Sequence, residues 1–121
     1  MLMLPLSASE LASLRAELAG AVCILPVVIN RVNQTTKQYQ QISPPGLLCG
    51  VREPGASTLQ NYEYMIGDLA TWHVQLPYGT DVADLDQLII TSPDGSMTTL
   101  VVNKVLAPRS YELLREVLAT E

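Results

Sequence analysis

The chain contains no phenylalanine, only one histidine, two cysteines and seven cations, and each shortage narrows what it can be. Without Phe, the core has to be built mainly from Leu, Val, Ile and Ala, with five Tyr and one Trp as the aromatic residues. Hydrophobic residues still make up 48% of the 121 positions. The chain can therefore bury an interior, and its length predicts a single domain over residues 1–121.

The shortage of positive charge argues against a protein that binds by neutralising phosphates. Seven Lys and Arg residues stand against twelve Asp and Glu, which gives a net charge of −5. Binding to a nucleic-acid backbone needs clustered cations. Arg31, Lys37 and Tyr39 are a thin match to a single-strand-binding surface. A nucleic-acid-binding barrel of the OB type therefore stays as the alternative function.

The scarce cysteines and histidine limit the chemistry that is available. Cys23 and Cys49 lie in the apolar stretches VCILP and LLCGV, so we expect buried free thiols. Together with His73 they cannot complete a structural zinc site, which needs four N or S ligands. His73 alternates out of phase with Trp72 and Val74, which predicts a structural or interface position on the polar face of a strand. The absence of a Gly-x-Ser-x-Gly elbow and of Gly-rich phosphate motifs argues against a serine hydrolase and a nucleotide cofactor.

Long apolar runs are also absent. Nothing approaches the roughly 18 apolar residues of a membrane span. The N-terminal stretch MLMLPLSAS is apolar, but it lacks the basic lead and the long apolar core of a signal peptide. We therefore expect a soluble chain made in a reducing cytoplasm.

The first element that the sequence predicts is an amphipathic helix over residues 7–20. It starts with a Ser-x-x-Glu capping box and reaches a plausible stop at Gly20. Leu11, Leu14 and Leu18 fall on one face of this helix.

Two further segments have helical spacing. Residues 57–69 follow the candidate N-cap Ser57, and residues 110–119 follow the breaker Pro108 with Ser110 as a cap. Their apolar residues recur at three- and four-residue steps: Leu59, Tyr62, Ile66 and Leu69 in the first segment, and Leu113, Leu114, Val117 and Leu118 in the second.

The remaining apolar segments predict strands. The stretch TWHVQLP alternates strictly, and QLIITSPDGSMTTLVVNKVL predicts two strands joined at a Pro-Asp-Gly turn, so residues 71–106 predict a three-strand β-meander. Residues 33–41 are polar and lack Gly and Pro, which indicates the tip of a long hairpin or a flexible loop that becomes ordered later. The expected fold is mainly β with helices (α+β), a small antiparallel β-barrel decorated by three helices.

Three aspartates, Asp81, Asp84 and Asp86, stand in the stretch LPYGTDVADLDQLII. A calcium loop would need a central Gly and a closing Glu, and neither is placed correctly here. A polar crossover between two strands explains the acids better, because Asp accepts backbone N–H bonds in turns. We expect Asp81 and Asp86 to do this, with no metal and no catalytic residue. A metal-dependent enzyme that uses the three aspartates is the second alternative.

The motifs run in a set order: the helix ELASLRAEL, a strand pair with a long polar loop, TWHVQLPYGTDVADLDQLII, a DG turn and TTLVVNKVLAPRSYELLREVLA. This order resembles the head-closure proteins of tailed bacteriophages, also called head-tail joining or stopper proteins. The likeness covers essentially the whole chain and is firmest over residues 71–118. One departure is Leu85, where many relatives would carry Gly.

The resemblance implies a non-enzymatic structural protein of the virion neck, made in the cytoplasm of a host bacterium. Such proteins form a homo-oligomeric ring of six or twelve copies between the portal or adaptor protein and the tail terminator or tail tube protein. The ring retains packaged DNA without sequence-specific binding and offers the tail a docking surface. No cofactor and no membrane are involved.

In related proteins a long loop between the early strands projects into the channel and closes it. The matching segment here is residues 33–41. The resemblance implies a channel-facing tip formed by Asn33, Gln34, Thr35, Thr36, Lys37 and Gln38. Candidate subunit interfaces lie on the first two predicted helices, at Leu11, Leu14, Leu18, Leu59 and Tyr62.

Overall fold

A computed structural model of the chain describes residues 7–52, 71–106 and 112–121. The predicted helix over residues 57–69, with Leu59 and Tyr62, lies outside the described residues. The described elements are α1 (Ala8–Val22), β1 (Leu25–Val32), β2 (Tyr39–Gln41), β3 (Leu48–Arg52), β4 (Thr71–Pro77), β5 (Gln87–Thr91), β6 (Met97–Val105) and β7 (Leu114–Thr120).

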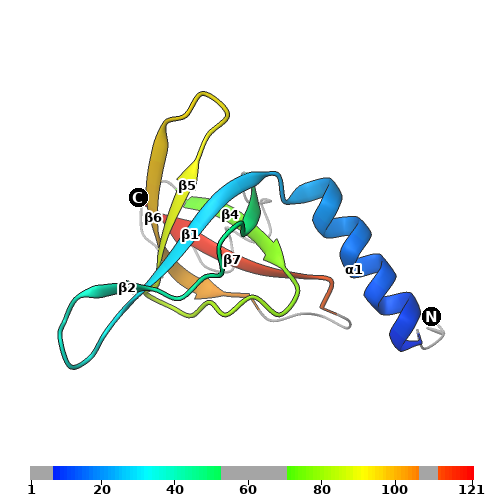
Figure 1. Cartoon of the computed structure of the whole chain (residues 1–121), viewed down its shortest axis with the longest axis horizontal. Coiled ribbons are helices and arrows are strands. Elements are labelled where there is room, and N and C mark those ends of the chain that lie inside the picture. Colours follow the sequence, from blue (N-terminus) through cyan, green and yellow to red (C-terminus); the bar gives the residue numbers. More distant parts are fainter. Residues whose placement is uncertain (1–6, 53–70, 107–111) are drawn as a thin grey trace.

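Six of the seven described strands close into a barrel, and all neighbouring strands are antiparallel. The order around the barrel is β1, β3, β4, β7, β6 and β5, and β5 returns to β1. The predicted α+β class with a small antiparallel barrel is therefore confirmed. Figure 1 shows the barrel with α1 on one side and the β1–β2 and β5–β6 hairpins projecting in different directions.

Aliphatic side chains fill the barrel interior. Val74 and Leu76 on β4 are fully buried, and Trp72 packs against the same cluster, as the alternation predicted. The adjacent residues of β7, Val117 and Ala119, face them across the strand pair. Each buried aliphatic side chain stabilises the fold by about 1.5–3 kcal/mol. The complete cluster consists of Val27, Ile29, Cys49, Val74, Leu76, Val82, Leu88, Ile90, Leu100, Val102, Val117 and Ala119.

The strands predicted within residues 71–106 are present, but they do not form a three-strand meander. β4 pairs with β3 and β7, whereas β5 pairs with β1 and β6. Two strands separate β4 from β5 in either direction around the barrel. The segment 78–86 is therefore a crossover from one side of the barrel to the other, and Val82 within it joins the core.

The predicted C-terminal helix over residues 110–119 is wrong, because β7 occupies Leu114–Thr120. β7 pairs with β4 along its whole length and with β6 over most of it. Its residues Val117–Thr120 are all buried, so both faces of β7 are covered there and its apolar residues lose the alternation of a surface strand. Leu114, Val117 and Leu118 then match a helical stripe by chance, an ambiguity that is common in short apolar runs.

α1 confirms the predicted N-terminal helix and its cap. The Ser7 hydroxyl accepts a hydrogen bond from the Glu10 backbone N–H at 3.1 Å. The helix continues two residues past Gly20, and its last turn closes where the Cys23 N–H donates to the Ala19 carbonyl at 2.8 Å. No residue of α1 is fully buried, so the helix rests on the barrel rather than within its core.

Candidate functional site at one end of the barrel

The β1–β2 hairpin extends beyond the barrel wall. β1 pairs with β5 only as far as Asn30, which faces Gln87, the first residue of β5. Its last two residues, Arg31 and Val32, continue past that point and pair with β2. All three residues of β2 are exposed. The polar segment predicted as a long hairpin tip or a flexible loop is therefore a projecting hairpin in this chain (Figure 1).

The hairpin tip is held by its own hydrogen bonds. The Asn33 N–H donates to the Gln38 carbonyl at 2.8 Å, and the Lys37 N–H donates to the Asn33 carbonyl at 2.7 Å. The Asn33 side-chain oxygen accepts from the N–H groups of Thr35 and Thr36, at 2.8 and 3.0 Å. Lys37 takes a left-handed conformation with φ of 60°. The backbone of the tip is thus satisfied locally, which leaves most of its side chains free to meet other molecules.

The six predicted tip residues lie together at the end of this hairpin. Five of them are exposed and one, Asn33, is partly buried. Their side chains offer amides, hydroxyls and a single positive charge. The exposed tip residues are Gln34, Thr35, Thr36, Lys37 and Gln38.

An ion cluster fastens the base of the hairpin to the barrel. The Arg31 guanidinium donates to both carboxylate oxygens of Asp86, at 3.0 and 2.8 Å, and to Asp81 at 3.0 Å. Asp86 is 2% exposed, whereas the Asp81 side chain is 71% exposed. A two-point Arg–carboxylate pair fixes direction as well as distance. The two carboxylates, Asp86 first, raise the pKa of Arg31, which stays charged.

The structural interpretation of the three aspartates is confirmed for two of them. Asp86 accepts from the Ala83 N–H at 2.9 Å, and Asp84 accepts from the Val105 N–H at 3.1 Å. Asp81 departs from the expectation, because its carboxylate pairs with Arg31 and no backbone N–H of a described residue donates to it. Within the described residues, no group of three or more His, Cys, Asp or Glu side chains could hold a metal ion.

Leu85, the departure from the resemblance, sits in a strained conformation within the crossover. Its φ is +73°, in the left-handed region that costs a residue with a Cβ about 1–2 kcal/mol. Its side chain is nevertheless 72% exposed, so burial does not offset this cost. Its N–H donates to the Val102 carbonyl at 2.8 Å, which fixes the turn to β6.

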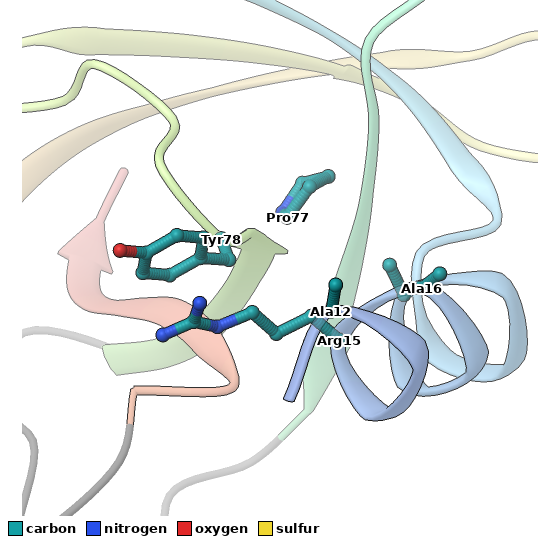
Figure 2. A pocket seen from close by; sticks show the side chains of 6 residues that line it. Ala12, Arg15, Ala16, Pro77 and Tyr78 are labelled. Carbon is teal, nitrogen blue, oxygen red and sulfur yellow. The ribbon is translucent and has the colours of Figure 1, made fainter. Parts of the chain in front are cut away.

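A groove lies between α1 and the end of β4, on the other side of the barrel from β5. Its volume is about 360 Å³. The Arg15 guanidinium carbon stands 3.3 Å from the centre of the Tyr78 ring, and the Arg15 Nε donates to the Glu112 carbonyl at 2.8 Å. Figure 2 shows the guanidinium and the ring stacked beside the helix. The lining residues are Ala12, Arg15, Ala16, Ala19, Pro77 and Tyr78.

The leucines predicted as an interface stand beside this groove rather than within it. Leu11 and Leu18 are half-buried, and Leu14 is 41% exposed. Ala12, Ala16 and Ala19 line the groove instead. The sequence did not indicate this surface, because alanine is common on buried and exposed helix faces alike.

Comparisons with protein-family models, curated proteins and solved structures found no match. The function is therefore inferred from the geometry of the chain and from the resemblance of its motifs. Among the described residues, no helix combines the length and the apolar composition that a membrane crossing requires.

His73 lies on the outward face of β4 as predicted, but it is buried at 3% exposure. Neither ring nitrogen forms a hydrogen bond with a described residue, and Nε2 lies 3.4 Å from Glu116 Oε1. His73 is the main cause that lowers the pKa of Glu116, and Gln75 contributes a hydrogen bond at 3.1 Å.

The two cysteines are free and buried, as predicted. Burial raises the pKa of the Cys49 thiol to about 12 and raises that of Cys23 as well. Thiols that hold their protons so strongly are poor nucleophiles and poor metal ligands.

Proposed function

We propose that this chain is a structural protein of a tailed-phage neck. It assembles with copies of itself into a ring between the portal or adaptor protein and the tail terminator or tail tube protein. The β1–β2 hairpins point into the channel and retain the packaged DNA. The observation that carries the proposal is the projecting hairpin with its exposed polar tip at residues 33–38.

The chemistry of the tip suits a closure that opens again. Amides and hydroxyls can hydrogen-bond to the same groups on neighbouring copies and exchange these bonds for water at little cost. Lys37 supplies the only charge at the tip. The net charge of −5 per chain disfavours tight binding of DNA to the assembled ring, because like charges repel.

The ion cluster supports the same proposal. A hairpin that blocks a channel must keep its direction under load. Arg31 ties the point where the hairpin leaves the barrel to Asp86, which is itself fixed by the Ala83 amide. The projecting part is therefore anchored in the barrel wall.

The nucleic-acid-binding alternative is weakened by the same contacts. Arg31 is one of the few cations near the hairpin, and two carboxylates already occupy its guanidinium. Lys37 is then the one remaining cation among residues 31–41. Titration of the isolated chain with single-stranded DNA at low and high salt tests this alternative. Tight, salt-sensitive binding would favour it over the neck protein.

The main test shortens the hairpin. Replacing residues 34–38 by one glycine leaves Asn33-Gly between the paired residues Val32 and Tyr39, which is the preferred two-residue hairpin turn. We expect phage that carry this variant to package DNA and then lose it. The measurement is the amount of nuclease-protected DNA in purified particles before and after storage.

The β5–β6 hairpin provides the matched control. Replacing residues 92–96 by Asn-Gly makes the same turn between Thr91 and Met97, at the opposite end of the barrel. Particles with this control should retain their DNA. Normal retention in particles with the shortened β1–β2 hairpin would count against a channel-closing role.

A further inference from the structure

The groove between α1 and β4 is an apolar surface that the described residues leave open. Ala12 and Ala16 are exposed there, and Tyr78 is exposed by 49%. The volume of about 360 Å³ is more than twice that of a cavity of roughly 150 Å³ that holds a benzene ring. The groove therefore has room for aliphatic side chains beside the two alanines (Figure 2).

The chemistry of the groove favours an uncharged, apolar occupant. Arg15 is the only charged side chain that lines it, and the partners of Arg15 lie within the chain. Its guanidinium stacks on Tyr78 and donates to the Glu112 carbonyl at 2.8 Å. The other lining residues are alanines and Pro77, which offer only apolar side chains. Burying such surface is favourable, whereas a charged occupant would lose its water without gaining a partner.

An apolar segment of this chain is attached directly beside the groove. Residues 1–6, MLMLPL, lie outside the described residues and consist only of Met, Leu and Pro. They join α1 at its N-cap, Ser7. Ala8, the first helical residue, is four positions before Ala12 and eight before Ala16, and side chains at four-residue steps share one face of a helix. The segment therefore enters α1 on the face that lines the groove.

The capping pattern of α1 directs the preceding residues towards the barrel. Ser7 accepts a hydrogen bond from the Glu10 N–H, as in a capping box. Leu6 precedes this N-cap and Leu11 is the fourth helical residue, which is the spacing of a hydrophobic staple. Leu11 is partly buried and lies one turn before Arg15, which lines the groove. The pattern thus predicts that the chain before Ser7 runs along the groove side of the helix.

The segment is also long enough to reach the alanines of the groove. An extended chain advances about 3.3 Å per residue, whereas a helix advances about 1.5 Å. Leu4 can therefore reach roughly 10 Å from Ser7, and Ala12 lies about 8 Å along the helix. Leu2 can reach roughly 17 Å, and Ala16 lies about 14 Å along the helix. Two leucines of the segment thus match the two exposed alanines.

We propose that residues 1–6 fold back along α1 and fill the groove between α1 and β4, with Leu4 beside Ala12 and Leu2 beside Ala16. Attachment at Ser7 keeps the segment close to the groove, so that even weak contacts keep it bound. The inference goes beyond the proposed function and does not depend on it, because the contact lies within one chain.

Cysteine cross-linking tests the contact in the full chain. Leu4→Cys and Ala12→Cys are placed in one chain, and Leu4→Cys with Ser13→Cys is the matched control. Ser13 is exposed like Ala12 and is its neighbour on α1, but it does not line the groove. The native thiols, Cys23 and Cys49, are buried and remain in both variants. With a small disulfide as the oxidant, we expect the intrachain bond to form about tenfold or more faster in the tested pair, because the bound segment raises the effective concentration of the two thiols.

A groove-filling substitution tests whether the groove is the binding site. Ala16→Leu in the tested pair should slow the cross-link to the rate of the control, because the added side chain occupies the space of the segment. Glu17→Leu adds the same side chain one residue further along, outside the groove, and should leave the rate unchanged. Both positions are exposed, so neither variant should disturb the barrel.

Three results would contradict the inference. Equal rates in the tested pair and in the Ser13 control would show that the tether alone brings the thiols together. Disulfide-linked dimers in place of the intrachain product would show that the groove takes the segment of a second copy. An unchanged rate with Ala16→Leu would place the contact outside the groove. None of these results involves the β1–β2 hairpin, so the neck proposal would stand.

Discussion

Asp86 is a buried carboxylate with three hydrogen bonds at the end of the barrel. It accepts two from Arg31 and one from the Ala83 amide, and it is 2% exposed. Such a group stabilises the fold only with its partners in place, because an unpaired buried charge is costly. Asp81 pairs with the same guanidinium but is exposed to solvent, and exposed ion pairs contribute little to the free energy of unfolding.

At the residue scale we therefore predict unequal effects for the two aspartates. Asp86→Ala should lower the free energy of unfolding by about 3 kcal/mol, because Arg31 and the Ala83 amide lose their acceptor. Asp81→Ala, the matched control, should cost no more than about 1 kcal/mol. Urea denaturation of both variants measures the difference. Equal losses would show that burial does not distinguish the two pairs.

At the element scale, the position of α1 depends on a close approach to β3. A Cβ on Gly50 would lie 2.6 Å from the Val22 carbonyl oxygen and 2.7 Å from Val22 Cγ1. Both atoms belong to the last residue of α1. The carbonyl oxygen is a backbone atom, so it can move away only if the end of the helix moves with it. Gly50 therefore sets how closely the helix end packs on the barrel.

We predict that Gly50→Ala destabilises the protein by about 1–3 kcal/mol through displacement of the helix end. Gly20→Ala provides the control within α1. Nothing lies within 4 Å of its added Cβ, and alanine is favoured over glycine in a helix by about 0.5–1 kcal/mol. Thermal unfolding should thus move down for Gly50→Ala and up for Gly20→Ala. An unchanged thermal midpoint for Gly50→Ala would mean that the end of α1 does not pack this closely against β3.

At the scale of the whole molecule, titratable groups whose pKa changes on folding determine how stability depends on pH. The lowered pKa of Glu116 means that the folded state prefers its carboxylate. Its contribution is present above pH 4.5, the ordinary value, and is lost as the pH falls through the lower folded value. The pKa of Cys49 moves the other way, from 9.0 to about 12, so its contribution is complete below pH 9.0 and is lost as the pH rises towards 12.

We expect a plateau of stability between these limits. Relative to the wild type, Glu116→Gln should lose less stability as the pH falls below 4.5. Cys49→Ala should lose less above pH 9, by about 1.4 kcal/mol for each pH unit. Urea midpoints at a series of pH values measure both slopes. If the stability of a variant and that of the wild type change in parallel with pH, the replaced group does not cause the loss of stability in that pH range.

The sequence contains part of the information about the ion cluster, namely the face on which each partner lies. Alternation places Arg31 on the inward face with Val27 and Ile29, and it places Asp86 on the inward face with Leu88. Opposite charges on inward faces of two strands predict a pair. Alternation alone could not say that β1 and β5 are neighbours, because they are far apart in the chain and barrel closure decides it.

β7 shows the opposite case. Its apolar residues match a helical pattern because both faces of β7 are buried over Val117–Thr120, so no alternation remains in the sequence. The pairing of β7 with β4 and β6 is equally invisible in the sequence, because it joins distant segments. Local propensity is weak compared with two ladders of hydrogen bonds and a shared core, so the tertiary context overrides it.

By itself, the sequence determined the features that depend on neighbouring residues: the capped helix α1, the alternation of β4 and the turn between β5 and β6. Only the tertiary structure decided that β7 is a strand, that Asp81 and Asp86 share Arg31, and that a groove opens between α1 and β4. The physical reason is the separation along the chain of the residues that interact. Hydrogen bonds within a few residues follow from local chemistry, whereas closure of a barrel joins residues that only the complete fold brings together.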